Sequence, residues 1–511
     1  MHRVLIAALT LPLAVVSIAS PSVAQTAEAA TKAAIARVQA TDPKIHAVIA
    51  LDPTALDQAR VIDGRKGAHG LLYGYAILIK DNIESDGPLP TTAGSMALLA
   101  NVTHRDAPLV ARLRAAGAVI LGKTNLSEWA NIRSSASISG WSAVGGQTRN
   151  PFALDRDPCG SSSGSGAAVA AGEVEAAIGT ETDGSITCPA AINGVVGLKP
   201  TVGLVSRSRI VPISHSQDTA GPIAADVTTA ARLLAAIAGS DPADPATREA
   251  DAHISDYLAG LKPDSLSGVR IGVLRFATGW SAETDKVFDK ALAVLRAQGA
   301  VLVDITELKD RDKLGDAETL VLNTELKVDL NAYLATTPAA VQSRTLAGLI
   351  AFNTAHAGRE LALFGQETFI KAEATKGLDD PAYKAARVLS LRIAGADGID
   401  TMLARDHLDA LVSPTMPPAW KIDAVNGDQI AGAGAGQLAA IAGYPHLTVP
   451  MGAVWGLPVG LSFIGPAWSE ARLLSYGYGY EQASRAKLTP HFLPTVEAEA
   501  PVAPLLEPLQ R

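Results

Sequence analysis

The sequence has too few cysteines and basic residues for several classes of protein. Its 511 residues include only two cysteines, Cys159 and Cys188, which excludes a scaffold held together by many disulfides. The 43 Lys and Arg residues are outnumbered by 51 Asp and Glu residues, and the formal net charge is −8. Because a surface that binds nucleic acid is normally basic, we expect no nucleic-acid partner.

Motifs for metals, phosphates and histidine-dependent nucleophiles are also missing. No His-Glu-x-x-His or Cys-x-x-Cys spacing occurs, and the chain's Gly/Ser-rich loop lacks the Gly-Lys-Ser/Thr ending of a phosphate-binding loop. Of the ten histidines, His215 and His446 are the best placed, yet neither belongs to a nucleophile motif, and we interpret both as structural. We therefore expect neither a metal nor another cofactor.

The N-terminus has the pattern of an export signal. Residues 1–24 combine a short basic start, an apolar run from Val4 to Ile18 and the small-x-small site Ser22-Val23-Ala24. A membrane anchor is the alternative, but the run is shorter than the roughly 20 residues that a spanning helix needs. The sequence therefore predicts a chain that begins near Gln25, is periplasmic or secreted, and has no stable association with a membrane.

Short apolar strands and helical segments alternate along the rest of the chain, of which 48% is hydrophobic. Residues 107–116 are expected to form a helix and residues 118–122 a strand, whereas residues 315–408 are mostly helical. Residues 26–61 are expected to form one or two surface helices. Because strands recur throughout and no linker interrupts them, we predict one large α/β domain over residues 25–511, with a mixed sheet between helical layers.

Two Gly/Ser-rich turns stand out within the segment Asp157–Thr201. The first covers residues 160–166 and the second residues 182–185, with Ala- and Val-rich runs between them. Glycine permits the backbone angles of a tight turn, which can direct several N–H groups at one point, as a developing oxyanion requires. Serines in such turns are candidate nucleophiles.

These turns and several other segments resemble the amidase signature family over about residues 28 to 480. The matching segments are Cys159–Ser165, Gly179–Pro189, Ile79–Asn82, Leu121–Asn125, Asp218–Pro222, Pro414-Thr415 and Gly456–Leu461. The resemblance implies a large α/β amidase fold and a serine amidohydrolase that needs no cofactor.

The resemblance also implies a Ser–Ser–Lys triad. By position, Ser185 is the nucleophile, Ser161 the bridging serine, preceded by a cis peptide bond, and Lys80 the base. Lysine acts as a base near neutral pH only where burial lowers its pKa, and the apolar residues before Lys80 provide such a setting.

Further site residues follow from the same comparison. Backbone N–H groups of Thr182, Asp183, Gly184 and Ser185 would form the oxyanion hole, and Ser162, Trp141 and Asp218 are candidates for substrate binding or support. Trp141 lies in a polar, Gly-rich loop expected at the mouth of the pocket.

Some positions depart from the family pattern, namely Cys159, Ser163, Asp183 and Thr187. We expect the Asp183 carboxylate to point away from the oxyanion or to orient the loop or substrate. The two cysteines flank the serine turns, and a disulfide and two buried thiols both remain open.

The variant motifs resemble bacterial peptide amidases, which remove the C-terminal amide of peptides. The alternatives are an amidase for aryl, fatty-acyl or small aliphatic amides, a component of the tRNA-dependent amidotransferase, which the export signal disfavours, and an amidase-like binding protein without turnover. A small-molecule or short peptide amide is thus the expected partner, and the oligomeric state is not predicted.

Overall fold

A computed structural model describes residues 26–66, 69–499 and 502–508. The predicted signal peptide, residues 1–24, lies outside this part of the chain. None of the described helices is long and apolar enough to cross a bilayer.

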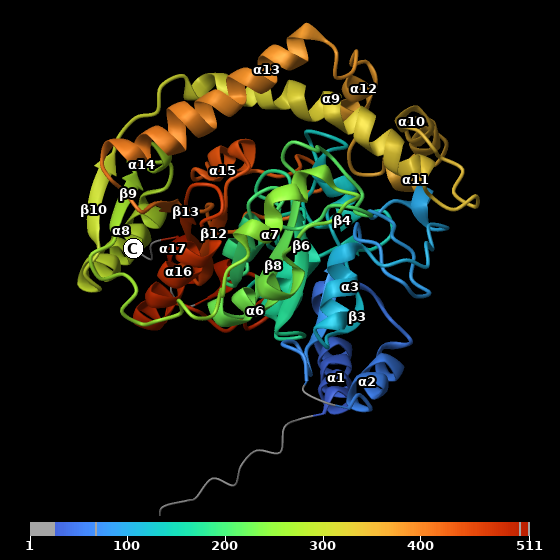
Figure 1. The fold of residues 1–511 in the computed structure, drawn as a ribbon, viewed down its shortest axis with the longest axis horizontal. Coiled ribbons are helices and arrows are strands. Elements are labelled where there is room, and N and C mark those ends of the chain that lie inside the picture. Colours follow the sequence, from blue (N-terminus) through green and yellow to red (C-terminus); the bar gives the residue numbers. More distant parts are fainter. Residues whose placement is uncertain (1–25, 67–68, 500–501, 509–511) are drawn as a thin grey trace, which may run out of the picture.

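An eleven-stranded mixed sheet runs through the whole molecule in the order β1-β3-β2-β6-β8-β7-β12-β13-β11-β9-β10 (Figure 1). A separate hairpin consists of β4 (Trp141–Ser142) and β5 (Gly146–Gln147). The strands of the large sheet are β1 (Val48–Leu51), β2 (Ala76–Lys80), β3 (Val119–Thr124), β6 (Ala176–Glu181), β7 (Val196–Lys199), β8 (Thr219–Ala224), β9 (Arg270–Leu274), β10 (Val301–Ile305), β11 (Ala410–Pro414), β12 (His446–Val454) and β13 (Leu457–Ile464).

Helices cover both faces of this sheet because its central strands are apolar on both sides. In β2, Ile77 and Ile79 belong to the hydrophobic core on one face, whereas Leu78 belongs to the core on the other. The first face packs on α3 (Pro108–Ala115), α6 (Val227–Ile237), α8 (Ala282–Ala297) and α16 (Glu470–Ser484). The opposite face packs on α1 (Ala27–Ile45), α2 (Ala55–Asp63), α4 (Ser163–Ala170) and α5 (Thr187–Ile192) beside β2 and β6, and on α14 (Thr401–Arg405) and α15 (Gly436–Ala442) beside β11 and β13.

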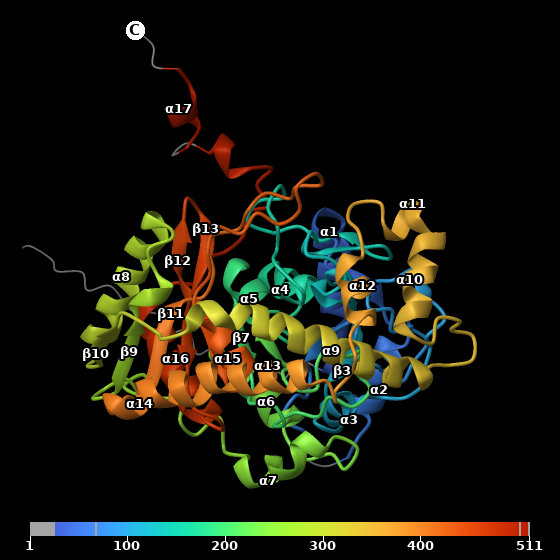
Figure 2. The same cartoon turned by 90° about the horizontal axis from the view of Figure 1, so that it is seen from above.

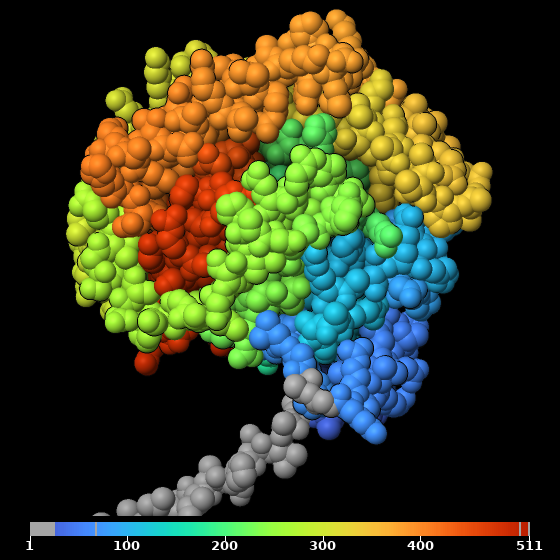
Figure 3. Space-filling view, viewed as in Figure 1, coloured from blue at the N-terminus to red at the C-terminus, as the bar shows by residue number. Residues whose placement is uncertain are grey.

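The mostly helical segment predicted for residues 315–408 forms an arch along one side of the sheet (Figures 1 and 2). Figure 3 shows its yellow and orange parts along the upper rim of the molecule. The arch contains α9 (Leu314–Ala335), α10 (Leu346–Ala355), α11 (Ala357–Glu360), α12 (Glu367–Glu373), α13 (Pro381–Leu391) and the π-helix Arg392–Asp400. The remaining helices are α7 (Ala250–His253) and α17 (Ala503–Leu506), and short 3₁₀ turns lie at Met96–Leu98, Glu128–Asn131, Pro245–Glu249, Arg275–Ala277, Arg311–Lys313 and Val496–Ala498.

The structure confirms the predicted fold class, a single large α/β domain with one mixed sheet. The expected helix and strand at residues 107–122 correspond to α3 and β3. The N-terminal prediction is incomplete, because residues 26–61 contain strand β1 between the two helices. β1 pairs antiparallel with β3 at the edge of the sheet, so its four residues depend on a partner far along the chain.

Candidate active site

Lys80 ends strand β2 and is fully buried. β2 lies between β3 and β6, and its preceding residues are apolar, so the lysine side chain projects from the end of the strand without contact with bulk water. Its Nζ donates to Ser161 Oγ at 2.7 Å, to Thr180 Oγ1 at 2.9 Å and to the Thr180 carbonyl at 3.2 Å. The structure thus brings together the lysine and the first serine that the motifs indicate.

Burial lowers the pKa of Lys80 from 10.5 to about 7. Desolvation disfavours the ammonium form, while the carboxylates of Asp218 and Glu181 oppose this decrease in pKa. A lysine with a pKa near 7 is partly neutral at physiological pH and can accept a proton from the serine beside it.

Ser161 is held in a tight turn between Cys159 and the first residue of α4. The Gly160–Ser161 peptide bond is cis, as expected, and the Ser161 carbonyl accepts a hydrogen bond from the Ser127 N–H at 3.1 Å. A side chain at Gly160 would place its Cβ 2.1 Å from Ser127 Oγ, which explains the glycine. Ser161 is fully buried and therefore lies beneath the surface of the pocket.

Ser162 connects the two serine turns. Its Oγ donates to the Thr180 carbonyl at 3.0 Å and accepts the Thr180 N–H at 3.2 Å. Its own N–H donates to the Ser185 carbonyl at 3.1 Å. The predicted supporting residue therefore fixes the relative position of the turns that carry Ser161 and Ser185.

The second turn follows strand β6 and leads into α5. Gly184 has φ +76°, a conformation that glycine adopts without strain. Within the described chain, the N–H groups of Asp183, Gly184 and Ser185 donate to no protein acceptor. Ser185 is 8% exposed and lines the pocket together with Asp183 and Gly184, so this turn borders the space that a substrate would occupy.

Glu181 is a supporting residue that the sequence analysis missed. Its Oε2 accepts the N–H groups of Ile186 at 2.7 Å and Thr187 at 2.9 Å, and it accepts the Thr187 hydroxyl at 3.2 Å. These bonds set the direction in which the chain leaves Ser185. A carboxylate as the last residue of an apolar strand was the available signal.

The substrate pocket has a volume of about 450 Å³. One wall comes from the segments around the serine turns and the other from residues after 310. Its lining residues are Ala130, Asn131, Ile132, Ser139, Cys159, Gly160, Thr182, Asp183, Gly184, Ser185, Thr187, Cys188, Ile213, Arg311, Leu322, Thr415, Met416, Asp428, Ile430, Ala433, Gly434, Gly436, Gln437 and His446.

Asp183 is open to the pocket and lines it beside Ser185. Desolvation raises the pKa of Asp183 from its usual value, and the nearby carboxylates of Glu318 and Glu181 raise it further.

Asp218 and Trp141 occupy different surroundings. Asp218 Oδ1 accepts the Thr182 hydroxyl at 2.6 Å, and its Oδ2 accepts two N–H groups from its own loop, so it positions the turn. Trp141 is 5% exposed and packs edge-on against Phe364, with ring centroids 5.2 Å apart. It does not line the pocket, contrary to the expectation that it would face substrate.

Cys159 and Cys188 form a disulfide with a Cα–Cα distance of 6.0 Å. The bond joins the residue two positions before Ser161 to the residue three positions after Ser185. Of the two possibilities left open by the sequence, the structure shows the disulfide. Both cysteines line the pocket, so the bond forms part of its wall.

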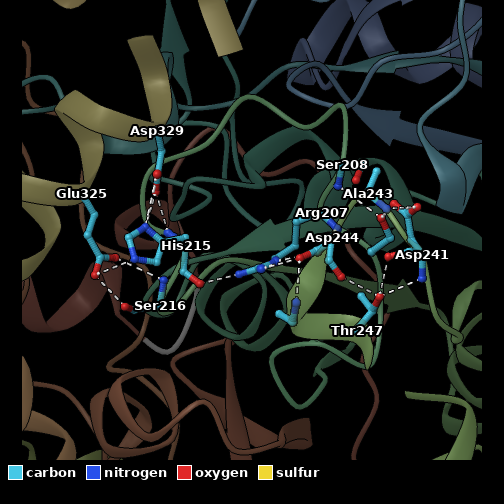
Figure 4. Close-up of polar contacts among 12 residues, drawn as sticks. Arg207, Ser208, His215, Ser216, Asp241, Ala243, Asp244, Thr247, Glu325 and Asp329 are labelled. Atoms are coloured by element: carbon cyan, nitrogen blue, oxygen red, sulfur yellow. Dashed lines mark hydrogen bonds and ion pairs between the residues drawn. The ribbon is translucent and has the colours of Figure 1, made fainter. Parts of the chain in front are cut away.

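In the described part of the chain, only His215, Glu325 and Asp329 form a cluster of metal-ligand type. The two ring nitrogens of His215 face different carboxylates, with Nδ1 2.9 Å from Asp329 and Nε2 3.5 Å from Glu325 (Figure 4). Glu325 also accepts hydrogen bonds from Ser214, Ser216 and Tyr383. The hydrogen bond with Asp329 raises the pKa of His215, and the arrangement is that of an ion pair between this loop and α9.

Comparison with known proteins shows what the chain resembles. A family model described as Amidase matches residues 29–474. The crystal structure of native peptide amidase from Stenotrophomonas maltophilia superposes with a TM-score of 0.85 at 51% identity, covering 91% of this chain and 95% of that one. A probable amidase of Arabidopsis thaliana is 38% identical over 88% of this chain and 86% of its own length.

The relatives extend to a second kind of enzyme. A glutamyl-tRNA(Gln) amidotransferase subunit from Moorella thermoacetica is 37% identical over 89% of this chain and 93% of its own length. The family match spans most of the described sheet and all the segments that surround Lys80, Ser161 and Ser185. The chain belongs to the amidase signature family and is an amide-hydrolysing enzyme.

Proposed function

We propose that this enzyme removes the C-terminal amide of peptides, giving a free carboxylate and ammonia, and that Lys80, Ser161 and Ser185 carry the reaction. The hydrogen bond of 2.7 Å from the buried lysine to Ser161 is the observation that supports this assignment most directly. The likeness to a peptide amidase at 51% identity supports the substrate class.

In the proposed relay, protons pass from Ser185 to Ser161 and from Ser161 to Lys80. Neutral Lys80 accepts the proton of Ser161, and Ser161 accepts the proton of Ser185, whose Oγ attacks the carboxamide carbon. The N–H groups of the turn at residues 182–185 stabilise the oxyanion of the tetrahedral intermediate. The same relay returns a proton to the nitrogen, so the C–N bond breaks and neutral ammonia leaves.

Hydrolysis of the acyl-enzyme repeats these transfers with water as the nucleophile. Water loses a proton to the relay and attacks the ester carbon, and the Ser185 oxygen leaves and regains its proton. The net reaction is peptide amide plus water to peptide acid plus ammonia. Asp218 and Glu181 take no part in the proton transfers. Their hydrogen bonds hold the turn at residues 182–185, and their negative charges favour the ammonium form of Lys80.

Ammonia release from a panel of substrates tests the proposed specificity. The panel contains C-terminally amidated dipeptides and tripeptides, together with aryl, fatty-acyl and small aliphatic amides. We expect the amidated peptides to give the highest kcat/KM. Faster release from any of the other amides contradicts the proposed substrate class without contradicting the triad.

A Ser185→Ala variant tests the nucleophile. We expect loss of turnover and loss of labelling by a fluorophosphonate probe, with an unchanged melting temperature because the hydroxyl is not part of the core. Ser163→Ala is the matched control, since this serine is buried in the same region but has no role in the relay. Normal turnover by Ser185→Ala contradicts the mechanism.

We also propose that the enzyme is exported, because residues 1–24 have the pattern of a signal peptide. N-terminal sequencing of protein recovered from the periplasm or medium should give a start near Gln25. An intact N-terminal methionine on the active protein contradicts export by cleavage.

A further inference from the structure

The substrate pocket, a small middle cavity and an outer pocket lie next to one another, and neighbouring cavities share lining residues. We propose that the middle cavity binds ammonia or water and that the three together form a passage by which ammonia leaves and water enters while substrate fills the main pocket. This inference rests on the proposed function, because it concerns a substrate whose amide end enters first.

The middle cavity has a volume of about 30 Å³. A bound water needs roughly 10–15 Å³ and two or more polar partners, and ammonia is of similar size. The lining combines polar side chains, among them Asn82, Thr180 and Asp218, with apolar ones, among them Ile210, Val211 and Ile213. The cavity therefore suits a single small polar molecule.

Asn82 provides a binding group beside the catalytic lysine. Its side chain is 3% exposed, and its Oδ1 has no hydrogen-bond partner in the part of the chain that the structure describes. Its Nδ2 donates to Thr180 Oγ1 at 3.0 Å, the same hydroxyl that accepts from Lys80 Nζ. A buried amide oxygen without a partner is costly, and an N–H or O–H donor in the cavity would satisfy it.

Shared lining residues connect this cavity in both directions. Ala130, Thr182 and Ile213 also line the substrate pocket. Arg207, Ile210, Pro212 and Asp218 also line an outer pocket of about 490 Å³. The middle cavity therefore lies between the two larger spaces and shares lining residues with each.

Ion pairs surround the outer pocket (Figure 4). Arg207 pairs with Asp244 at 2.6 Å and donates to the His215 carbonyl at 2.5 Å, and the His215 ring pairs with Asp329. These charged groups belong to the lining of the outer pocket. They also hold the loop of residues 207–218, which lines both the outer pocket and the middle cavity.

The order of events explains the need for a second route. A peptide that enters with its carboxamide first places its nitrogen at the base of the pocket and its remaining residues in the mouth. When Ser185 Oγ forms the ester bond and the C–N bond breaks, ammonia is produced behind the acyl chain. The water that hydrolyses the ester must reach the same place before the acyl chain can leave.

Val211 offers a way to block the passage, because it lines the middle cavity and neither of the others. Val211→Phe enlarges a side chain that lines the middle cavity and should obstruct it. We expect kcat for an amidated tetrapeptide to decrease at least fivefold, and kcat for an amino-acid amide such as leucinamide to change less than twofold, because this small substrate leaves the mouth open. Ile210→Phe, at the boundary with the outer pocket, should give the same selective loss.

Val341→Phe is the matched control, since Val341 is buried in the same hydrophobic cluster as Val211 and lines none of the three cavities. It should leave the ratio of the two kcat values unchanged. Equal losses on both substrates in Val211→Phe and Ile210→Phe, or no loss in either, overturn the passage. If the wild-type enzyme hydrolyses small amides but no amidated peptide, the proposed function fails instead.

Discussion

The pH dependence of kcat/KM provides a direct test of Lys80 as the base. Only neutral Lys80 can accept a proton, and its pKa is about 7. The neutral fraction is then about one tenth at pH 6, one half at pH 7 and nine tenths at pH 8. We expect kcat/KM for an amidated dipeptide to increase about fivefold from pH 6 to pH 7, and less than twofold from pH 7 to pH 8.

A change of charge near the lysine should move this curve. The Asp218 carboxylate favours the ammonium form of Lys80, so Asp218→Asn lowers the lysine pKa further. The acidic limb should move to lower pH by about one unit, the lower end of what a nearby opposite charge contributes. The asparagine Oδ1 can still accept the Thr182 hydroxyl, but its Nδ2 cannot accept the N–H groups of Ile213 and Ser214, so the variant's melting temperature is compared with that of the wild type.

Steady-state rates at eight or more pH values, with melting temperatures over the same range, separate titration of the base from unfolding. Asp241→Asn is the control, because that carboxylate bonds to Ser206 and the backbone of its own loop. Its profile should match the wild type. A limb centred above pH 9, or a shift of the Asp218→Asn limb to higher pH, would refute the assignment of Lys80 as a desolvated base.

Three further predictions concern the support of the site. Replacing Cys159 and Cys188 by serine should lower the free energy of unfolding by about 3–4 kcal/mol, measured in denaturant without reductant, because the bond closes a loop of about 30 residues. Arg133→Met leaves the buried Glu128 carboxylate without its partner and should cost about 3–5 kcal/mol, whereas the double change to Met and Gln should recover part of this loss. Glu181→Leu should lower kcat at least tenfold with little change in the fluorophosphonate-labelled fraction, because two N–H groups after the nucleophile lose their acceptor.

Local motifs predicted the principal site residues because each motif is a turn whose geometry depends on neighbours in the sequence. The glycines and serines at residues 160–166 and 182–185 form tight turns wherever the strands place them. Lys80 could be assigned only through family resemblance, because a lysine at the end of an apolar strand usually has no catalytic role. The roles of the three residues in turnover stay predictions.

Partners across the sheet could not be predicted in this way. Thr180 lies within an apolar strand, and its hydroxyl meets Lys80 only because β2 and β6 are adjacent and parallel. The distance between Cys159 and Cys188 likewise depends on how α4 and α5 pack. For Trp141, a local pattern suggested a contact that the structure does not show. A tryptophan in a polar loop was expected to contact substrate, whereas Phe364 from a distant segment packs against it and buries it.

The fold itself was predictable in class but not in detail. Alternation of apolar strands and helices favoured one large sheet, but no local pattern specifies an order of eleven strands. Strand β1 was missed because all its residues are only half-buried and its sequence is ordinary for a helix–turn region. The helices of the arch were recognisable, whereas their position over the sheet follows from tertiary packing.

The two walls of the substrate pocket have a practical consequence for enzyme engineering. All three residues assigned to the reaction lie between positions 80 and 185, whereas Arg311, Leu322, Met416 and Ile430 line the opposite wall from later segments. A library restricted to residues 311–446 can therefore vary which acyl groups are accepted while leaving the lysine and serines in their native setting. Because the reacting residues and the opposite wall of the pocket come from different parts of the chain, related enzymes can change their substrates while their catalytic residues stay the same.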